Sequence, residues 1–120
     1  MKNENPKIEW TQKFGKPCLK FTFTKMLTEE DAEIAIFKWK EEFQSKKEES
    51  IILIWDCKKM NGYETAARIR WTEAMKDMKS QIDKIWLISD SVITRMGASA
   101  MSLFSSINIK TVHSESEVKI

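Results

Sequence analysis

Two carboxylates that follow apolar runs are the first candidates for chemistry in this chain. Asp56 comes directly after Ile51–Trp55, and Asp90 follows Ile85–Ser89. If both runs are neighbouring parallel strands, their carboxyl ends lie at one edge of the sheet, where open α/β sheets bind ligands. Paired carboxylates there could act as acid and base or hold a metal ion. Ordinary helix capping explains the same residues, so an enzyme using Asp56 and Asp90 is the least favoured of three functional hypotheses.

The segment after Asp56 adds polar groups that could contact a ligand or a protein partner. Together with Asp56 and Asp90, the candidate contact residues are Asn61, Gly62, Tyr63, Thr65 and Ser91. The N-terminus of the second helix, which this segment leads into, would offer unpaired backbone N–H groups to an anion. The plainer alternative is that Asn61 caps this helix, with Glu64 at the third position, while Gly62 makes the turn.

The remaining reactive side chains form no recognised catalytic motif. The sequence contains one histidine, His113, which excludes a histidine-rich metal site. Its two cysteines, Cys18 and Cys57, are too few for a disulfide framework. We therefore expect no metal, no cofactor and no enzymatic activity.

Composition places the chain among globular intracellular proteins. It has 120 residues, 42% of them hydrophobic and 32% charged, with a net charge of +2. Interspersed charges of both signs argue against nucleic acid as a partner. The N-terminus lacks an apolar signal segment, and no run approaches the roughly 18 apolar residues of a membrane span. We expect a cytoplasmic protein with a flexible tail over residues 1–6 and a single domain over 7–120.

Hydrophobic patterning predicts the element order ββαβαβαβ. Alternation in the first two strands indicates an antiparallel hairpin, whereas the unbroken apolar runs indicate buried central strands. Right-handed strand–helix–strand units then specify an α/β fold with a mostly parallel sheet of about five strands and three to four helices. The predicted strands are Lys7–Gln12, Cys18–Thr24, Ile51–Cys57, Lys84–Ser89 and Ile107–Val112.

Apolar stripes on the predicted helices indicate which faces are buried. Trp39 and Trp71 fall on such stripes, so we place them in the core rather than in a pliable pocket. Trp10, on an expected edge strand, and Ile69, off its helix's stripe, are left as candidate interface residues. The third helix carries Val92, Met96, Ala100, Leu103 and Phe104 along one side. Its small residues 97–100 are expected to pack tightly onto the sheet, although they could instead admit a ligand or a partner helix.

Three short segments carry a further signal: residues 27–31 ahead of the first helix, the strand at 51–56, and the strand and cap at 84–90. With the order of elements, they resemble the STAS-like (SpoIIAA-like) domains of sulfate-transporter tails and bacterial anti-sigma-factor antagonists. The resemblance covers roughly Cys18 to His113. It implies an Asp-Ser-Ser-Gly-type phosphorylation loop before the second helix. Residues 59–65 instead read Lys-Met-Asn-Gly-Tyr-Glu-Thr, which leaves Thr65 as the nearby hydroxyl.

The favoured hypothesis is a non-enzymatic interaction module in a bacterial cytoplasm. It would contact a protein partner, or a second copy of itself, through the 56–65 loop and the second helix. The rival hypothesis is a carrier for a small apolar ligand or a nucleotide. A carrier predicts a cavity near Trp71, Met75, Met78 and Ala100, where an interaction module predicts a filled core.

Overall fold

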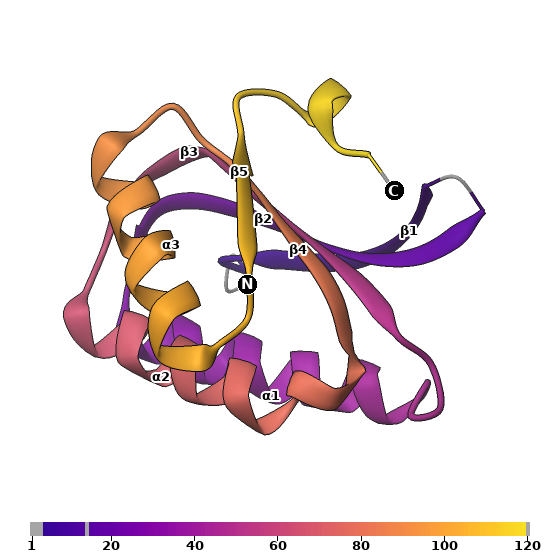
Figure 1. The fold of residues 1–120 in the computed structure, drawn as a ribbon. Coiled ribbons are helices and arrows are strands. Elements are labelled where there is room, and N and C mark those ends of the chain that lie inside the picture. Colours follow the sequence, from indigo (N-terminus) through magenta and orange to yellow (C-terminus); the bar gives the residue numbers. More distant parts are fainter. Residues whose placement is uncertain (1–3, 14, 120) are drawn as a thin grey trace.

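The computed structural model describes residues 4–13 and 15–119. Its five strands form one sheet in the order β1-β2-β3-β4-β5, with β1 antiparallel to β2 and the other pairs parallel (Figure 1). The predicted α/β fold is confirmed. In chain order the elements are β1 (Lys7–Lys13), β2 (Lys16–Leu27), α1 (Glu29–Gln44), β3 (Ile51–Tyr63), α2 (Thr65–Asp77), η1 (Lys79–Gln81), β4 (Ile82–Ile88), α3 (Val92–Ser105), β5 (Ile109–Val112) and η2 (Glu115–Glu117).

The strand order decides where the helices lie. From β2 to β5 each strand is placed beside the one before it, so successive right-handed crossovers put every helix on the same face of the sheet. Figure 1 shows α1, α2 and α3 gathered on one side. The main core lies between them and the sheet, and it includes Trp55 of β3, Trp39 of α1 and Trp71 of α2.

Aromatic rings fill the centre of this core. Phe21 of β2 meets Trp39 edge-on with ring centroids 5.3 Å apart, and it meets Trp71 at 5.8 Å. Trp55 contacts both indoles at 6.0–6.2 Å. The placement of Trp39, Trp55 and Trp71 in the core is confirmed. Edge-to-face pairs of this kind contribute about 0.5–1.5 kcal/mol each beyond the area that they bury.

The opposite face of the sheet is covered by the C-terminal segment. Val118 packs on Ile52 and Ile54, which point away from the helices. Glu115 fastens the segment by ion pairs to Lys20 at 2.7 Å and Lys13 at 3.2 Å. The hydrogen bond between Glu115 and Lys20 lowers the pKa of the carboxyl group and raises that of the ammonium.

The loop predicted after Cys57 is instead the continuation of β3. It pairs with an extension of β2 as far as Leu27 opposite Tyr63, through two register shifts. The prediction that Asn61 caps the second helix is therefore wrong: Asn61 lies in β3, and Glu64 occupies the N-cap of α2 without a side-chain cap bond. Because β4 ends at Ile88, opposite Asp56, the extension is a two-stranded ribbon whose exposed polar side chains look like a loop in sequence.

The start of the chain is fastened to this ribbon. Of the predicted tail over residues 1–6, residues 1–3 lie outside the described residues. Asn5 holds β2 at a register shift: its amide donates to the Thr24 carbonyl at 2.6 Å, and its oxygen accepts from the Thr24 N–H at 2.9 Å. Within residues 4–13 and 15–119, no helix has the length and hydrophobicity that crossing a bilayer requires.

The third helix is located as predicted. Thr94, Gly97, Ala98 and Ser105 form its buried side, so two of the small residues expected to pack onto the sheet, Gly97 and Ala98, do so. The large apolar residues along another side, Val92, Met96, Leu103 and Phe104, are exposed.

Candidate functional site

The two predicted carboxylates do not form a pair. Asp56 is buried on the helix-free face, where its Oδ1 accepts from the Lys58 N–H at 3.1 Å and its Oδ2 lies 3.8 Å from the Lys58 ammonium. Asp90 is exposed and pairs with His113, which also lies beside Arg95. The two strand ends are adjacent, as predicted, but each carboxylate has its own partner. Among the described residues, no group of three or more His, Cys, Asp or Glu side chains could hold a metal ion.

Capping explains Ser91, and Thr65 stays a candidate for modification or contact. Ser91 Oγ accepts from the Thr94 N–H at 3.2 Å and caps α3. Thr65 is exposed in the first turn of α2. Asn61 is exposed on the ribbon, and Gly62 lies next to it with a backbone φ of 158° and the Met26 side chain against its α-carbon. These residues do not converge on a polar site.

Tyr63 differs from the other members of the predicted group because its side chain packs against α3. Its ring lies over α3 at Gly97, where an added Cβ would come within 2.3 Å of the hydroxyl oxygen. The hydroxyl donates to the Ile93 carbonyl at 3.3 Å. A side chain at position 97 would therefore exclude this ring position, so the glycine sets how closely the end of β3 approaches α3.

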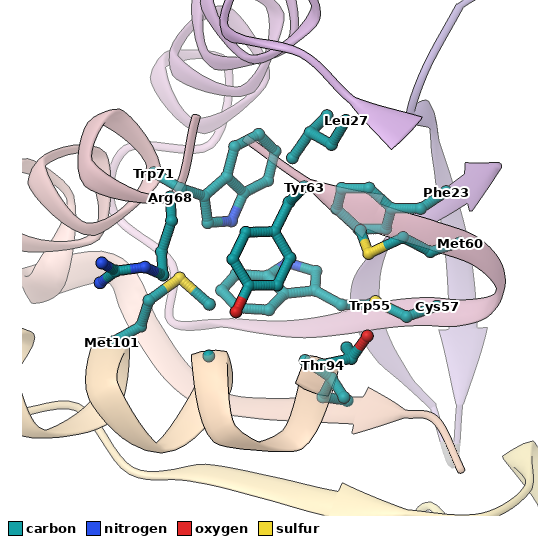
Figure 2. A pocket seen from close by; sticks show the side chains of 12 residues that line it. Phe23, Leu27, Trp55, Cys57, Met60, Tyr63, Arg68, Trp71, Thr94 and Met101 are labelled. Carbon is teal, nitrogen blue, oxygen red and sulfur yellow. The ribbon is translucent and has the colours of Figure 1, made fainter. Parts of the chain in front are cut away.

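An apolar pocket opens beside Tyr63, between β3, α2 and α3 (Figure 2). The centre of a water-sized sphere can move through about 40 Å³ of it. A single water needs about 10–15 Å³ on this measure, so the space holds a short chain or a ring rather than a drug-sized ligand. Its walls are Phe23, Leu27, Trp55, Cys57, Met60, Tyr63, Arg68, Trp71, Leu87, Thr94, Gly97 and Met101.

The predicted cavity is thus displaced toward the β3 ribbon. Trp71 lines it, as expected, but Met75 is fully buried in the core and is not among the wall residues. Cys57 contributes an inert surface, because burial raises the pKa of its thiol far above the ordinary range. The Trp55 indole N–H is buried without a hydrogen-bond partner in the described chain.

The second exposed feature is the outer face of α3, defined here as Val92, Ile93, Met96, Leu103 and Phe104. These five side chains are 62–77% exposed. They fall on one side of the helix, opposite Ala98. Several large apolar side chains exposed together on one side of a helix are typical of a contact site.

Comparison with known proteins identifies the fold family. A model of the SpoIIAA-like family matches residues 18–119, which is most of the chain. The chain belongs to the SpoIIAA-like family. A similar solved structure is an uncharacterized DUF3478-family protein from Shewanella loihica PV-4 with a SpoIIAA-like fold. The two superpose with a TM-score of 0.76 over 98% of this chain and 93% of that one, at 13% sequence identity. At this identity the likeness shows the fold alone. No curated protein matches the chain.

Two interface candidates in this SpoIIAA-like protein have different surroundings. Trp10 is half-buried: its indole N–H donates to Glu42 at 3.0 Å, and the Lys46 ammonium lies 5.3 Å from the ring centre. Ile69 is exposed on α2, as expected. Neither belongs to the outer face of α3, so their role in an interface stays a prediction.

Sequence reasoning missed the residues that define the pocket and the outer face. Met60 was placed in a loop, and Arg68 and Met101 were not singled out. The signal for the outer face was present, because the apolar stripe of α3 was found. The small residues Gly97 and Ala98 indicated the side that meets the sheet, but the pattern did not show that the large apolar stripe would stay exposed.

Proposed function

We propose that this SpoIIAA-like domain is a non-enzymatic interaction module whose contact surface is the outer face of α3. The proposed occupant is the same face of a second copy of the chain. The observation that carries the proposal is the exposure of five large apolar side chains on one side of a single helix. Transferring such side chains out of water is the main driving force of protein association.

The amount of surface is sufficient for a pair of copies. Side chains of these sizes at the observed exposure present roughly 600 Å² per copy, or about 1,200 Å² in a symmetric pair, the lower end for a stable interface. Ile93, Met96, Ala100 and Leu103 recur at spacings of three, four and three residues, which suits helix-on-helix packing. An antiparallel pair would set the Ile93 end of one α3 against the Leu103 end of the other, with Ala100 near the axis.

The charges on α3 do not oppose this contact. Arg95 is the charged residue of α3, and its Nε donates to the Ser89 carbonyl at 2.9 Å. Its guanidinium also lies beside His113. Because Arg95 is engaged within its own copy, two outer faces can meet without desolvating an unpaired charge.

The test is the molar mass in solution across the micromolar range, measured by sedimentation or light scattering. We expect a dimer for the wild type and a monomer for Leu103→Lys/Phe104→Lys, since a buried lysine pair would weaken association by about a hundredfold or more. The matched control is Phe37→Lys on α1, where an equally exposed side chain (68%) is changed elsewhere. A wild type that stays monomeric, or a control that dissociates the dimer equally, would contradict the proposal.

A small apolar-ligand carrier is the second candidate, and the pocket beside Tyr63 supports it. The walls are almost entirely apolar, with one charged residue, Arg68, among those described. They favour an apolar ligand over a nucleotide, because the base and phosphates would find few hydrogen-bonding partners there.

A further inference from the structure

We propose that the pocket binds a slender amphipathic anion, with its apolar chain among the aromatic and methionine side chains and its anionic group at Arg68. This inference rests on the carrier candidate above. It is independent of the outer face of α3, because none of that face's five residues lines the pocket.

The anionic end follows from the isolation of Arg68. Its side chain is half-buried at the pocket wall and makes no ion pair or hydrogen bond with any described residue. Arg70, two positions along α2, instead pairs with Glu29 at 2.6 Å and Glu33 at 3.1 Å. Figure 2 shows the Arg68 stem descending beside Trp71 along the pocket wall, with its guanidinium turned outward near Met101, away from the Tyr63 and Trp55 rings. Because no carboxylate of the described chain pairs with this guanidinium, it can donate hydrogen bonds to the carboxylate of a ligand.

The apolar part of the proposed ligand is inferred from the side chains that line the pocket and from the volume of the pocket. Trp55 and Trp71 supply flat surfaces, and Met60 and Met101 supply side chains that adapt to the shape of a ligand. The free space admits a narrow alkyl chain of a few carbons, and a longer chain would need the methionines or the Tyr63 ring to move. Ligands of intermediate chain length should therefore bind best.

A third observation also indicates a ligand. The indole N–H of Trp55, a residue of the pocket wall, is buried without a hydrogen-bond partner in the described chain, as are those of Trp39 and Trp86 elsewhere in the core. Figure 2 shows the Thr94 hydroxyl directed toward the same space. An oxygen atom on the ligand chain would accept a hydrogen bond from the indole, which otherwise carries the cost of its desolvation.

The experiment is a titration of the full chain with straight-chain carboxylates from butanoate to decanoate, below their aggregation limits. The signals are tryptophan fluorescence, to which Trp55 and Trp71 report directly, and calorimetry. We expect saturable binding that peaks at intermediate length, with octanoate bound more tightly than octanol or octylammonium. Arg68→Gln should weaken the binding of octanoate by about tenfold, which is the effect of losing one charge-assisted contact. It should leave the affinity for octanol unchanged.

The matched control is Arg70→Gln, which removes an arginine from the same helix but not from the pocket. The proposal would be overturned if Arg68→Gln and Arg70→Gln lost equal affinity for octanoate, or if the wild type bound octanoate no more tightly than octylammonium. Binding to anionic phospholipid vesicles but not to free carboxylates would overturn it in favour of a membrane surface. The variant Leu103→Lys/Phe104→Lys should bind octanoate like the wild type. A failure of the proposed dimer therefore leaves the ligand result intact, and the reverse also holds.

Discussion

Two neighbouring helices, α2 and α3, use their apolar residues in opposite ways. The helix α2 buries its large side chains, Trp71 and Met75, against the sheet. The helix α3 has the more continuous apolar stripe, yet it turns Met96 and Leu103 to solvent. The comparison shows that an apolar stripe establishes that a face must be covered, but does not establish that the protein's own sheet covers it.

The difference has a local physical cause. The side of α3 that meets the sheet consists of small residues, with Gly97 and Ala98 at its middle, and the Tyr63 ring occupies the space at the glycine. Small side chains let the helix lie close to β3 and to the short edge strand β5. The larger residues then have no room on that side, because protein interiors are packed to the density of organic crystals.

The largest expected effect would test the contrast between the two helices directly. Met75→Lys should destabilise the fold by more than about 4 kcal/mol or prevent folding, because the ammonium would be buried without a partner. Leu103→Lys should change the free energy of unfolding by less than about 0.5 kcal/mol in dilute protein. Urea denaturation of both variants measures the difference. A large loss for Leu103→Lys in the monomer would show that Leu103 is packed against the rest of the chain rather than exposed.

An intermediate effect is expected where α3 meets the ribbon. Gly97→Ala should destabilise by about 1–3 kcal/mol despite the helix preference of alanine, because the new Cβ displaces the Tyr63 ring. The double variant Gly97→Ala/Tyr63→Leu should recover most of this loss, and a double-mutant cycle in denaturant measures the coupling. A Gly97→Ala variant more stable than the wild type would show that Tyr63 does not set the position of α3.

The smallest effect concerns how the two helices begin. The helix α3 has a side-chain cap, Ser91 Oγ on the Thr94 N–H, whereas Glu64 gives α2 no such bond. Ser91→Ala should therefore lower the free energy of unfolding by about 1 kcal/mol, and Ser91→Thr should retain most of the stability. Thermal unfolding monitored by circular dichroism measures both variants. Equal stability of Ser91→Ala and the wild type would indicate that the cap contributes nothing net.

Much of the fold was predictable because the information is local. The apolar runs at Ile51–Trp55 and Ile85–Ile88 identified buried strands. The start of α1 is equally local, because the Thr28 hydroxyl accepts a hydrogen bond from the Asp31 N–H at 3.1 Å. The site was less predictable. Asn61 was taken for a helix cap because polar residues near a glycine look alike in a turn and in an exposed two-stranded ribbon.

The sequence by itself determined the order of elements, the family and the existence of an apolar stripe on each helix, because these depend on spacing along the chain. The tertiary structure alone decided that the large apolar stripe of α3 stays exposed, that Tyr63 lies on Gly97, and that the Arg68 side chain beside an apolar pocket has no ion-pair or hydrogen-bond partner among the described residues. These outcomes depend on contacts between residues tens of positions apart. Packing between such residues decides which side chains have room and which charges find a partner, and no pattern within one element carries that information.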